Sequence, residues 1–442
     1  MLDVRGKRVL VLGLGVSGLA VAQFLAGQGA KLVLVDRNEK LDRGSLPAGE
    51  IHLGAEDPAW LKGVDSVVTS PGVPRTSAIL TGAVAAKIPV MGEIEFASRF
   101  LSAPIAAITG TNGKSTVTMM LDEMLKAAGM RTFVGGNLGT PLVKAIGGVY
   151  DALVVEVSSF QLEWIEKFRP RVGIYLNLTD DHFDRYQSLE DYGAAKARIF
   201  ENQDSGDWAI LNRDDANVWK LARTVRAQVF SFGMLASGET PAIWPVGKHL
   251  DFQMRARKGQ INMAGFRLPG AHNVANAMAA SAAALAMFAD VGPIERAIRS
   301  FAGLPHRIEF VREADGVTWI DDSKGTNVGA VVEAIEAVTA PIVLLAGGLD
   351  KGGNYAPLLG PIRTKVKLVI LFGAASEKMR DALAGTPTPI RLVPTLKDAV
   401  ELAAKVAKQG DTVLLSPACA SFDQFKDYAE RGNVFQELVR AL

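Results

Sequence analysis

The chain carries one segment whose residue types and spacing predict a definite chemistry, Gly110-Thr111-Asn112-Gly113-Lys114-Ser115-Thr116. An apolar run at 104–107 precedes this segment, and helix-forming residues follow it to position 128. A strand that breaks into a glycine turn and then a helix directs several backbone N–H groups at one point. Lys114 adds a positive charge there, and Ser115 a hydroxyl that suits a phosphate-bound Mg²⁺. The segment therefore predicts a nucleoside triphosphate site, in a short form with Ile108 where the usual G-x-x-x-x-G-K-[ST] pattern has glycine.

Length and composition narrow the class of protein. With 442 residues, 48% of them apolar and 21% charged, the chain is long enough for about two to four globular domains. The net charge of +1 is not that of a nucleic-acid surface or a polybasic membrane anchor, so we expect neither partner. A single cysteine, Cys419, excludes an intramolecular disulfide and a cysteine-based zinc site. The first residues lead into an apolar strand rather than a signal peptide, and we expect a cytoplasmic protein.

Apolar strands alternate with helical segments, and this alternation begins afresh three times. Such strands, at 8–13, 31–36, 152–157, 172–178, 341–348 and 368–373, are typical of parallel α/β sheets covered on both faces. We therefore predict an α/β protein with three domains, over residues 1–92, 93–300 and 301–442. Short alternating pieces at 229–268 could form an antiparallel patch, and we expect 234–250 to be a surface insertion. A helix is expected over 273–288.

The first segment contains a glycine fingerprint. Gly13-Leu14-Gly15-Val16-Ser17-Gly18 matches G-x-G-x-x-G, and Asp36 ends the next apolar strand. Taken alone, this pattern indicates dinucleotide binding, with the acidic residue on a ribose hydroxyl, so a nicotinamide-dependent oxidoreductase is one alternative. Glycines that only permit close strand–helix packing are another. Because the segment offers no residues for hydride transfer and a stronger nucleotide site follows, we favour a substrate linked to a nucleotide such as UDP.

The second segment offers further polar candidates. Glu156 ends an apolar strand, where a carboxylate beside a phosphate loop suits Mg²⁺ binding. His182, in an aspartate-rich loop, could ligate a cation or be a hydrogen-bonded loop residue, and both interpretations stay open. The helical spacing of Lys196 predicts a solvated side chain, while Asn273, three residues before Asn276, is most simply explained as a helix cap.

Polar side chains also follow strands of the third segment. The carboxyl ends of parallel strands share one edge of a sheet, where ligands bind. Lys351 follows one strand exit and Ser421 another. The largest group surrounds the first strand and could close over a bound nucleotide: Arg307, Asp322, Ser323, Lys324, Thr326 and Asn327.

Two longer stretches, together with the phosphate loop, carry a family resemblance. EVSSFQLE at 156–163 and LSPACASFDQF at 415–425 resemble the Mur ligase family, the ATP-dependent amide-forming enzymes of peptidoglycan precursor synthesis. The resemblance covers the whole chain and is strongest to the member that adds D-glutamate. The Asp-Asn-Pro-Arg motif of the diaminopimelate-adding member is missing, and folylpolyglutamate synthases share the phosphate loop but not these two stretches.

The resemblance implies a fold and a reaction. The fold is that of a three-domain Mur ligase, with a Rossmann-like N-terminal domain, a central P-loop ATPase-type domain and a Rossmann-like C-terminal domain. The reaction is ATP-dependent ligation of D-glutamate to UDP-N-acetylmuramoyl-L-alanine through an acyl phosphate. We expect a monomer whose third domain closes over the cleft after ATP binds. A protein that hydrolyses ATP slowly, as a nucleotide-gated binding or regulatory module, is a further alternative.

The resemblance also implies a role for each candidate residue. Lys114, Glu156, His182 and Lys196 would be catalytic. ATP would be held by residues 110–116 with Asn276, Arg307 and Asp322. Two Mg²⁺ ions would be bound by Ser115 with Glu156 and by His182 with Lys196, the lysine being carbamylated by CO₂. The UDP-substrate would contact Ser17, Asp36, Ser70, Gly72 and Asn137, and D-glutamate would contact Lys324, Thr326, Lys351, Ser421 and Phe422, with Tyr428 as a further aromatic contact. Whether His182 or the carbamate deprotonates the incoming amine is left open.

Overall fold

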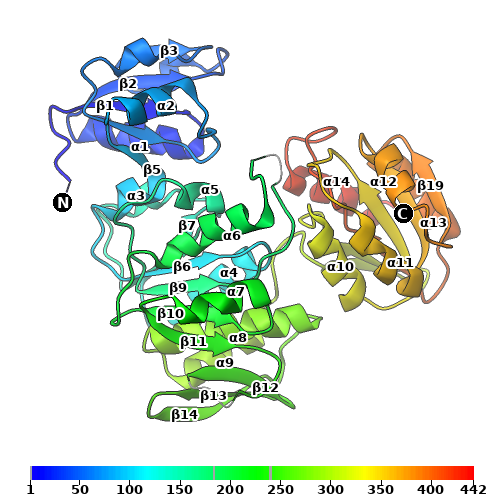
Figure 1. Ribbon diagram of the computed structural model, residues 1–442. Coiled ribbons are helices and arrows are strands. Elements are labelled where there is room, and N and C mark those ends of the chain that lie inside the picture. Colours follow the sequence, from blue (N-terminus) through cyan, green and yellow to red (C-terminus); the bar gives the residue numbers. More distant parts are fainter. Residues whose placement is uncertain (1, 183–184, 238–240) are drawn as a thin grey trace.

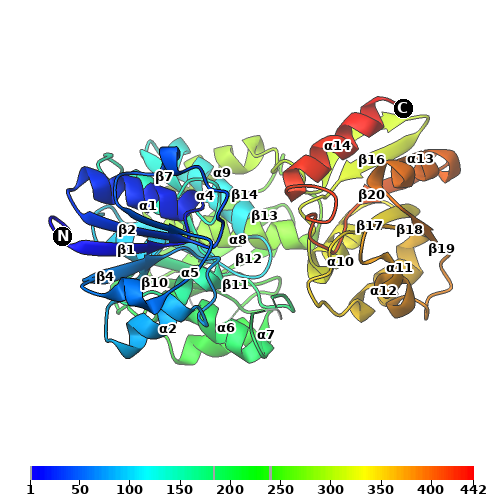
Figure 2. The same cartoon turned by 90° about the horizontal axis from the view of Figure 1, so that it is seen from above.

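Three β-sheets follow one another along the chain (Figure 1). The computed structural model describes residues 2–182, 185–237 and 241–442. The N-terminal sheet lies at one end of the central sheet, above α3 and α5 in Figure 1. The C-terminal sheet lies beside the central one (Figures 1 and 2). Among the described residues, no helix combines the length and the apolar character needed to cross a membrane.

The N-terminal sheet has five parallel strands in the order β3-β2-β1-β4-β5, so the strand order reverses between β1 and β4. Nearly every residue of β1 (Arg8–Leu12) and β2 (Lys31–Asp36) is buried, as expected for strands covered on both faces. The other elements are α1 (Val16–Gly27), β3 (Glu50–Leu53), β4 (Ser66–Thr69), α2 (Ala78–Ala85) and β5 (Val90–Gly92). The turns after β1 and β4 therefore meet where doubly wound sheets bind ligands.

The central sheet has nine strands in the order β14-β13-β12-β11-β10-β9-β6-β8-β7. It is parallel from β7 to β12 and ends in the antiparallel pairs β12–β13 and β13–β14. Its strands are β6 (Ile105–Thr109), β7 (Thr132–Gly136), β8 (Ala152–Glu156), β9 (Val172–Tyr175), β10 (Trp208–Asn212), β11 (Gln228–Phe232), β12 (Ala242–Val246), β13 (His249–Met254) and β14 (Arg257–Asn262). Its helices are α3 (Glu93–Ser98), α4 (Lys114–Ala127), α5 (Ser159–Leu162), α6 (Leu189–Ala197), α7 (Ala216–Trp219), α8 (Ala271–Ala286) and α9 (Val291–Ser300).

The C-terminal sheet has six strands in the order β15-β16-β20-β17-β18-β19, all parallel except β15. Its strands are β15 (Glu309–Ala314), β16 (Val317–Asp321), β17 (Ile342–Gly347), β18 (Val366–Phe372), β19 (Ile390–Val393) and β20 (Thr412–Leu415). Its helices are α10 (Val328–Ala337), α11 (Leu359–Lys365), α12 (Ser376–Ala382), α13 (Leu396–Val406) and α14 (Tyr428–Arg440).

The predicted α/β class is confirmed, and two local expectations are wrong. Residues 242–250, expected within a surface insertion, form β12 and begin β13, with Ala242 and Ile243 fully buried; residues 238–240 of that segment lie outside the described part of the chain. Helix α8 begins at Ala271 with Gly270 as its N-cap, so Asn273 is not the cap. Its side chain instead donates to Pro269 O at 2.7 Å. The domain boundaries after residues 92 and 300 stay predictions.

Side chains connect the three sheets directly. Arg185 donates to Pro71 O and Val73 O of the N-terminal part at 3.2 Å each, while its guanidinium pairs with Glu163 at 2.6 Å. On the other side, Asn327, the N-cap of α10, donates to Asn112 Oδ1 at 3.1 Å. The phosphate loop thus lies at the junction between the central and C-terminal sheets.

Glu93 is a buried carboxyl at the passage from the N-terminal to the central sheet. It is 1% exposed; one carboxyl oxygen accepts from Val143 N at 2.7 Å, and the other has no hydrogen-bond partner. Burial raises its pKa from 4.5 to about 7. Because the folded-state pKa is the higher one, the stability that this group contributes is fully present below pH 4.5 and is lost as pH rises through 7.

Replacing Glu93 by glutamine is therefore expected to remove a pH dependence. The free energy of unfolding of Glu93→Gln minus that of the wild type should increase by about 1–3 kcal/mol from pH 5 to pH 8. Urea unfolding at both pH values measures this gain, with the exposed Glu39→Gln as control. An identical effect of Glu93→Gln at the two pH values would show that the carboxyl is already ionised at pH 5.

Candidate active site

The phosphate loop joins the end of β6 to the start of α4, as the sequence predicts. Two of its glycines need backbone conformations that L side chains rarely adopt, with φ of 152° at Gly110 and 83° at Gly113. A Cβ at Gly113 would also collide with Asn276 Oδ1, which shows how closely α8 approaches the loop. Asn276 is thereby placed against the loop, as the resemblance implies.

Two lysines converge on a single atom of this loop. Lys114 Nζ and Lys196 Nζ each donate to Gly110 O at 2.9 Å. Lys196 is 1% exposed, and its ammonium lies 4.3 Å from the centroid of the Tyr192 ring, so the solvated side chain expected from its spacing is wrong. Burial lowers the pKa of both lysines, and the charge of Lys114 lowers that of Lys196 further, well below its usual value. Burial and the charge of Lys114 therefore both favour the neutral form of Lys196 more than in an exposed lysine.

Glu156 faces the first turn of α4 from the end of β8. It is 2% exposed, and its two oxygens accept from Ser115 Oγ at 2.7 Å and from Asn137 Nδ2 at 2.6 Å. The parallel pairing of β6 and β8, with Ile108 opposite Glu156, brings this carboxylate to the loop. Asn137 thus lies beside the phosphate loop.

His182 follows β9 in a left-handed conformation, with φ of 57°. Its Nε2 lies 3.7 Å from Asp181 Oδ2, and its ring packs edge-on against Phe160, with 4.8 Å between centroids. Asp181 also pairs with Lys351 Nζ, which reaches across from the C-terminal sheet, at 3.1 Å. Burial opposes ionisation of Asp181, but the charges of Lys351 and His182 outweigh it and lower the pKa of the carboxyl. His182 and Lys196 both lie near the ring of Tyr192, a residue that sequence reasoning missed.

The C-terminal candidates are spread over several loops. Asp322 is 4% exposed, accepts from Ser416 Oγ at 2.6 Å, and has its pKa raised to about 7 by burial, against the opposing charge of Arg307. Lys324 donates to Tyr428 Oη at 3.1 Å. Ser421 is buried, whereas Phe422 is 68% exposed. Thr326 follows Lys324 in the same loop, and its N–H donates to Lys324 O at 2.9 Å.

Four of the predicted substrate contacts line one cavity. Ser17, Asp36, Ser70 and Gly72 surround a space of about 430 Å³ at the reversal point of the N-terminal sheet. The Asp36 carboxylate accepts from Leu14 N at 2.5 Å and from Asn38 N at 2.7 Å, and therefore shapes the glycine turn. Asn137 does not line this cavity, because it is held by Glu156.

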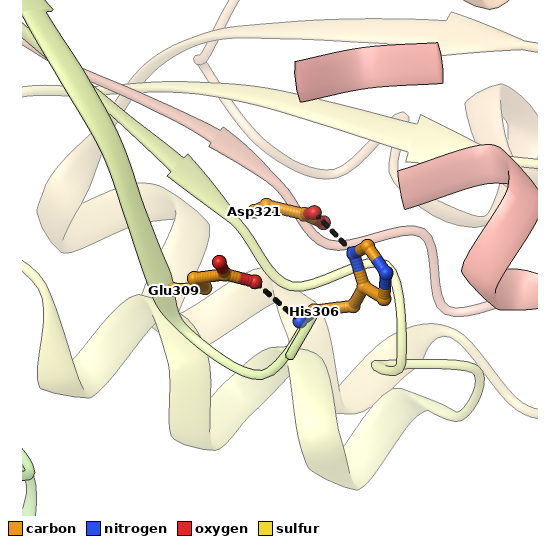
Figure 3. A group of neighbouring side chains, drawn as sticks. All are labelled: His306, Glu309 and Asp321. Carbon is orange, nitrogen blue, oxygen red and sulfur yellow. Dashed lines mark hydrogen bonds and ion pairs between the residues drawn. The ribbon is translucent and has the colours of Figure 1, made fainter. Parts of the chain in front are cut away.

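A cluster behind Arg307 and Asp322 was also missed by sequence reasoning (Figure 3). The His306 ring faces Asp321, with 2.7 Å between Nδ1 and Oδ2. The backbone N–H of His306 donates to the Glu309 carboxylate at 2.7 Å. The side-chain amide of Gln436 donates to both carboxylates, at 2.9 and 3.0 Å. The sequence could have indicated this cluster, because His306 directly precedes Arg307 and Asp321 directly precedes Asp322. We interpret the cluster as a set of contacts that holds the backbone next to it in place and thereby positions Arg307 and Asp322.

Asp321→Asn is expected to destabilise the protein by about 1–3 kcal/mol at pH 6, because it takes a charged partner from a buried imidazole. The hydrogen bond to Asp321 raises the pKa of His306, so the stability from this pair is present below pH 6.5 and is lost as pH rises through the folded-state pKa. The difference from the wild type should therefore shrink at pH 9. Thermal unfolding at both pH values tests this, with Asp315→Asn in the exposed β15–β16 turn as control; a loss as large at pH 9 as at pH 6 would refute the charged pair.

Two solved structures similar to this chain in fold are ligases by name. A pseudomurein peptide ligase type C from Methanothermus fervidus is 19% identical, with a TM-score of 0.63, and the match covers 98% of this chain and 99% of that one. A MurF ligase from Thermotoga maritima, solved in complex with ADP, is 17% identical with a TM-score of 0.62, over 100% of this chain and 97% of that one. At these identities the likeness establishes the three-part fold.

Sequence comparisons are more specific. The chain is 46% identical to a UDP-N-acetylmuramoylalanine–D-glutamate ligase of Geotalea uraniireducens over 100% of this chain and 99% of that protein, and 45% identical to the one of Syntrophotalea carbinolica with the same coverage. Family models match three successive ranges: the Mur ligase MurD-like N-terminal domain at 7–92, the Mur ligase middle domain at 108–284, and the Mur ligase glutamate ligase domain at 306–419. The chain therefore belongs to the Mur ligase family.

Proposed function

We propose that the protein is an ATP-dependent ligase that joins D-glutamate to UDP-N-acetylmuramoyl-L-alanine through an acyl phosphate, a step of peptidoglycan precursor synthesis. The observation that carries the proposal is the convergence of Lys114 and Lys196 on the phosphate loop, whose Ser115 also binds Glu156. The chain that contains this site is 46% identical to a ligase of that name over its full length. We further propose that it acts as a monomer in the cytoplasm on these small molecules, without a nucleic-acid or membrane partner.

The phosphate loop has unused hydrogen-bonding capacity for ATP. Asn112 Nδ2 and the hydroxyls of Thr109 and Thr116 are buried without a hydrogen-bond partner. Backbone N–H groups at the start of α4 and the ammonium of Lys114 supply positive potential for the phosphates. Asn276, which touches the loop, and Arg307 and Asp322, across the junction, would bind the adenosine part and the phosphates.

The donor set around the loop fits Mg²⁺. Carboxylate and hydroxyl oxygens are the ligands that this ion prefers, and Glu156 with Ser115 supplies one of each within 2.7 Å of each other. His182 and Lys196 would hold a second ion, the lysine as its carbamate. When bound, the two ions neutralise charge on the transferring phosphoryl group.

The surroundings of Lys196 favour carbamylation. Burial and Lys114 lower the pKa of this lysine, so its amine is neutral more often than that of an exposed lysine. Only the neutral amine has the lone pair that attacks CO₂. The N–C bond forms, one proton leaves, and the resulting carbamate carries one negative charge. That charge would replace a like-charge contact with Lys114 by an attractive one.

The chain's own residues would then act on a phosphoryl-transfer step and on an acyl-transfer step that follows it. The alanyl carboxylate attacks the γ-phosphorus of ATP, ADP leaves, and Lys114 balances the charge that develops on the phosphates. The amine of D-glutamate attacks the acyl phosphate, loses a proton to His182 or to the carbamate, and expels inorganic phosphate. Contacts such as Lys351–Asp181 and Asn327–Asn112 would keep the C-terminal part over the loop and exclude water from the acyl phosphate.

Two further regions would bind the other substrates. The cavity lined by Ser17, Asp36, Ser70 and Gly72 would hold the uridine diphosphate, with Asn137 nearer to the reacting end. D-Glutamate would be oriented by the positive charges of Lys324 and Lys351 and by the exposed ring of Phe422. The hydroxyls of Thr326 and Ser421 would complete its binding site.

The test is phosphate release with each substrate omitted in turn. We expect release only when ATP, UDP-N-acetylmuramoyl-L-alanine and D-glutamate are all present, and we expect L-glutamate and meso-diaminopimelate to replace D-glutamate poorly. Release that needs neither the UDP-substrate nor the amino acid would indicate a plain ATPase. Calorimetric binding of NAD to the N-terminal cavity would instead favour the oxidoreductase alternative.

A further inference from the structure

A second cavity is lined by residues of β9, α6 and α7, and α6 and α7 lie next to each other in Figure 2. Its volume is about 410 Å³, within the range of about 300–1,000 Å³ found for small-molecule pockets. Its walls are mostly apolar and include Tyr175, Leu178, Gly193, Ala197, Asn217 and Leu221. The net charge of the lining is zero, because two carboxylates, Glu190 and Glu201, are balanced by Arg198 and Lys220. A lining without net charge favours a neutral occupant.

One polar atom of this lining has no partner. Tyr175 is 1% exposed, and its hydroxyl makes no hydrogen bond within the described chain. A Cβ at Gly193 would lie 3.8 Å from that hydroxyl and 2.7 Å from Leu178 Cδ2, so the missing side chain leaves the hydroxyl uncovered on the side of α6. Burial raises the pKa of Tyr175, which keeps the hydroxyl protonated as a hydrogen-bond donor. A buried donor without a partner is rare in folded proteins and marks a place for an acceptor.

Both walls of the cavity lead to the phosphate loop. Tyr175 pairs with Thr109 in the β6–β9 ladder, and Leu176 N donates to Thr109 O at 3.0 Å. The opposite wall is α6, whose other face carries Lys196 and its hydrogen bond to Gly110 O. A molecule that shifts Tyr175 or α6 therefore shifts a residue next to the loop or a lysine bound to it.

We propose that this cavity is an effector site for a small, neutral, mostly apolar molecule with one hydrogen-bond acceptor, which binds the Tyr175 hydroxyl and changes nucleotide affinity at the phosphate loop. Occupancy by such a molecule gives the orphaned donor its partner and fills apolar space. The binding part of the proposal is independent of the reaction; the coupling part rests on the proposed function, because it requires a nucleotide at the loop.

The binding part is tested with 4-fluoroacetophenone, followed by ¹⁹F NMR on the full chain. Its matched analogue without an acceptor is 1-ethyl-4-fluorobenzene. We expect Tyr175→Phe, which removes only the hydroxyl, to weaken the ketone about fivefold and to leave the hydrocarbon unchanged. Equal affinity of the ketone for both proteins would overturn the proposal.

A second variant fills the cavity from its rim. Asn217 is exposed, so Asn217→Trp is compatible with folding and would cover the opening with an indole ring. We expect this variant to lose binding of both probes while its urea midpoint stays at the wild-type value. Undiminished binding of either probe to the folded variant would place that probe elsewhere and refute the site.

Coupling is tested by reciprocity. The dissociation constant of ADP, measured by calorimetry with and without saturating 4-fluoroacetophenone, should change by the same factor by which ADP changes the affinity of the ketone, about 5-fold or more. An unchanged ADP constant would overturn the coupling alone. Failure of ADP to bind under any condition would instead count against the proposed function, while the Tyr175→Phe result would still decide the site.

Discussion

Replacing Lys196 by alanine is expected to lower substrate-dependent phosphate release by about 10²–10³-fold or more. The side chain is 1% exposed and donates to Gly110 O at 2.9 Å, and the charges of Lys114 and Glu156 both act on its amine. The variant removes the anionic ligand that the carbamate would provide, and leaves the cations of the site without that balancing charge. Lys167→Ala, on an exposed lysine, is the matched control and should keep the wild-type rate.

The same variant separates a carbamate from an ordinary lysine. Small carboxylates such as acetate or propionate can enter the space left by the side chain and supply an anion, so they should restore part of the activity of Lys196→Ala. The same carboxylates should restore no activity in Glu156→Gln, because glutamine fills the space of the glutamate side chain and leaves no room for them. Absence of rescue, with a wild-type urea midpoint confirming that the variant is folded, would show that Lys196 acts as an amine.

The parts of the site that depend on local sequence could be predicted. The strand–loop–helix around Gly110 and Gly113, the position of Glu156 at a strand end and the glycine turn that leads to Ser17 follow from short-range rules about backbone conformation and buried strands. The polar residues after β6 and β8 also lie at one sheet edge, because neighbouring parallel strands end on the same side of the sheet.

The parts that depend on contacts between distant segments could not be predicted from spacing. The burial of Lys196 arises because α6 packs beside a loop 86 residues earlier in the chain, and only the family resemblance pointed to it. The His306–Asp321 pair and the contact of Asn327 with Asn112 join segments 15 and 215 residues apart. The antiparallel patch indicated by the short alternating pieces at 229–268 is present as β12, β13 and β14. The surface insertion expected at 234–250 was wrong, because the sequence does not show the edge of the parallel sheet to which β12 adds.

Lys114 is the other residue whose loss should have a large effect. In this structure its ammonium lies on the loop itself, donating to Gly110 O at 2.9 Å and Thr111 O at 2.8 Å. The same loop holds polar atoms of Asn112 and Thr116 that have no hydrogen-bond partner. Lys114→Met retains most of the chain length without the charge. We expect phosphate release to fall about 10³-fold, because one cation that stabilises the transferring phosphoryl group is lost.

The effect should be confined to the nucleotide. Lys126→Met is the matched control, because Lys126 lies on the same helix, has a side chain that is 58% exposed and pairs with Asp122. Calorimetry should show that Lys114→Met binds the UDP-substrate as the wild type does, since the N-terminal cavity is formed by other elements. If Lys114→Met kept the wild-type rate of phosphate release, the phosphoryl group could not be transferred at this loop, and the proposed reaction would need another nucleotide site.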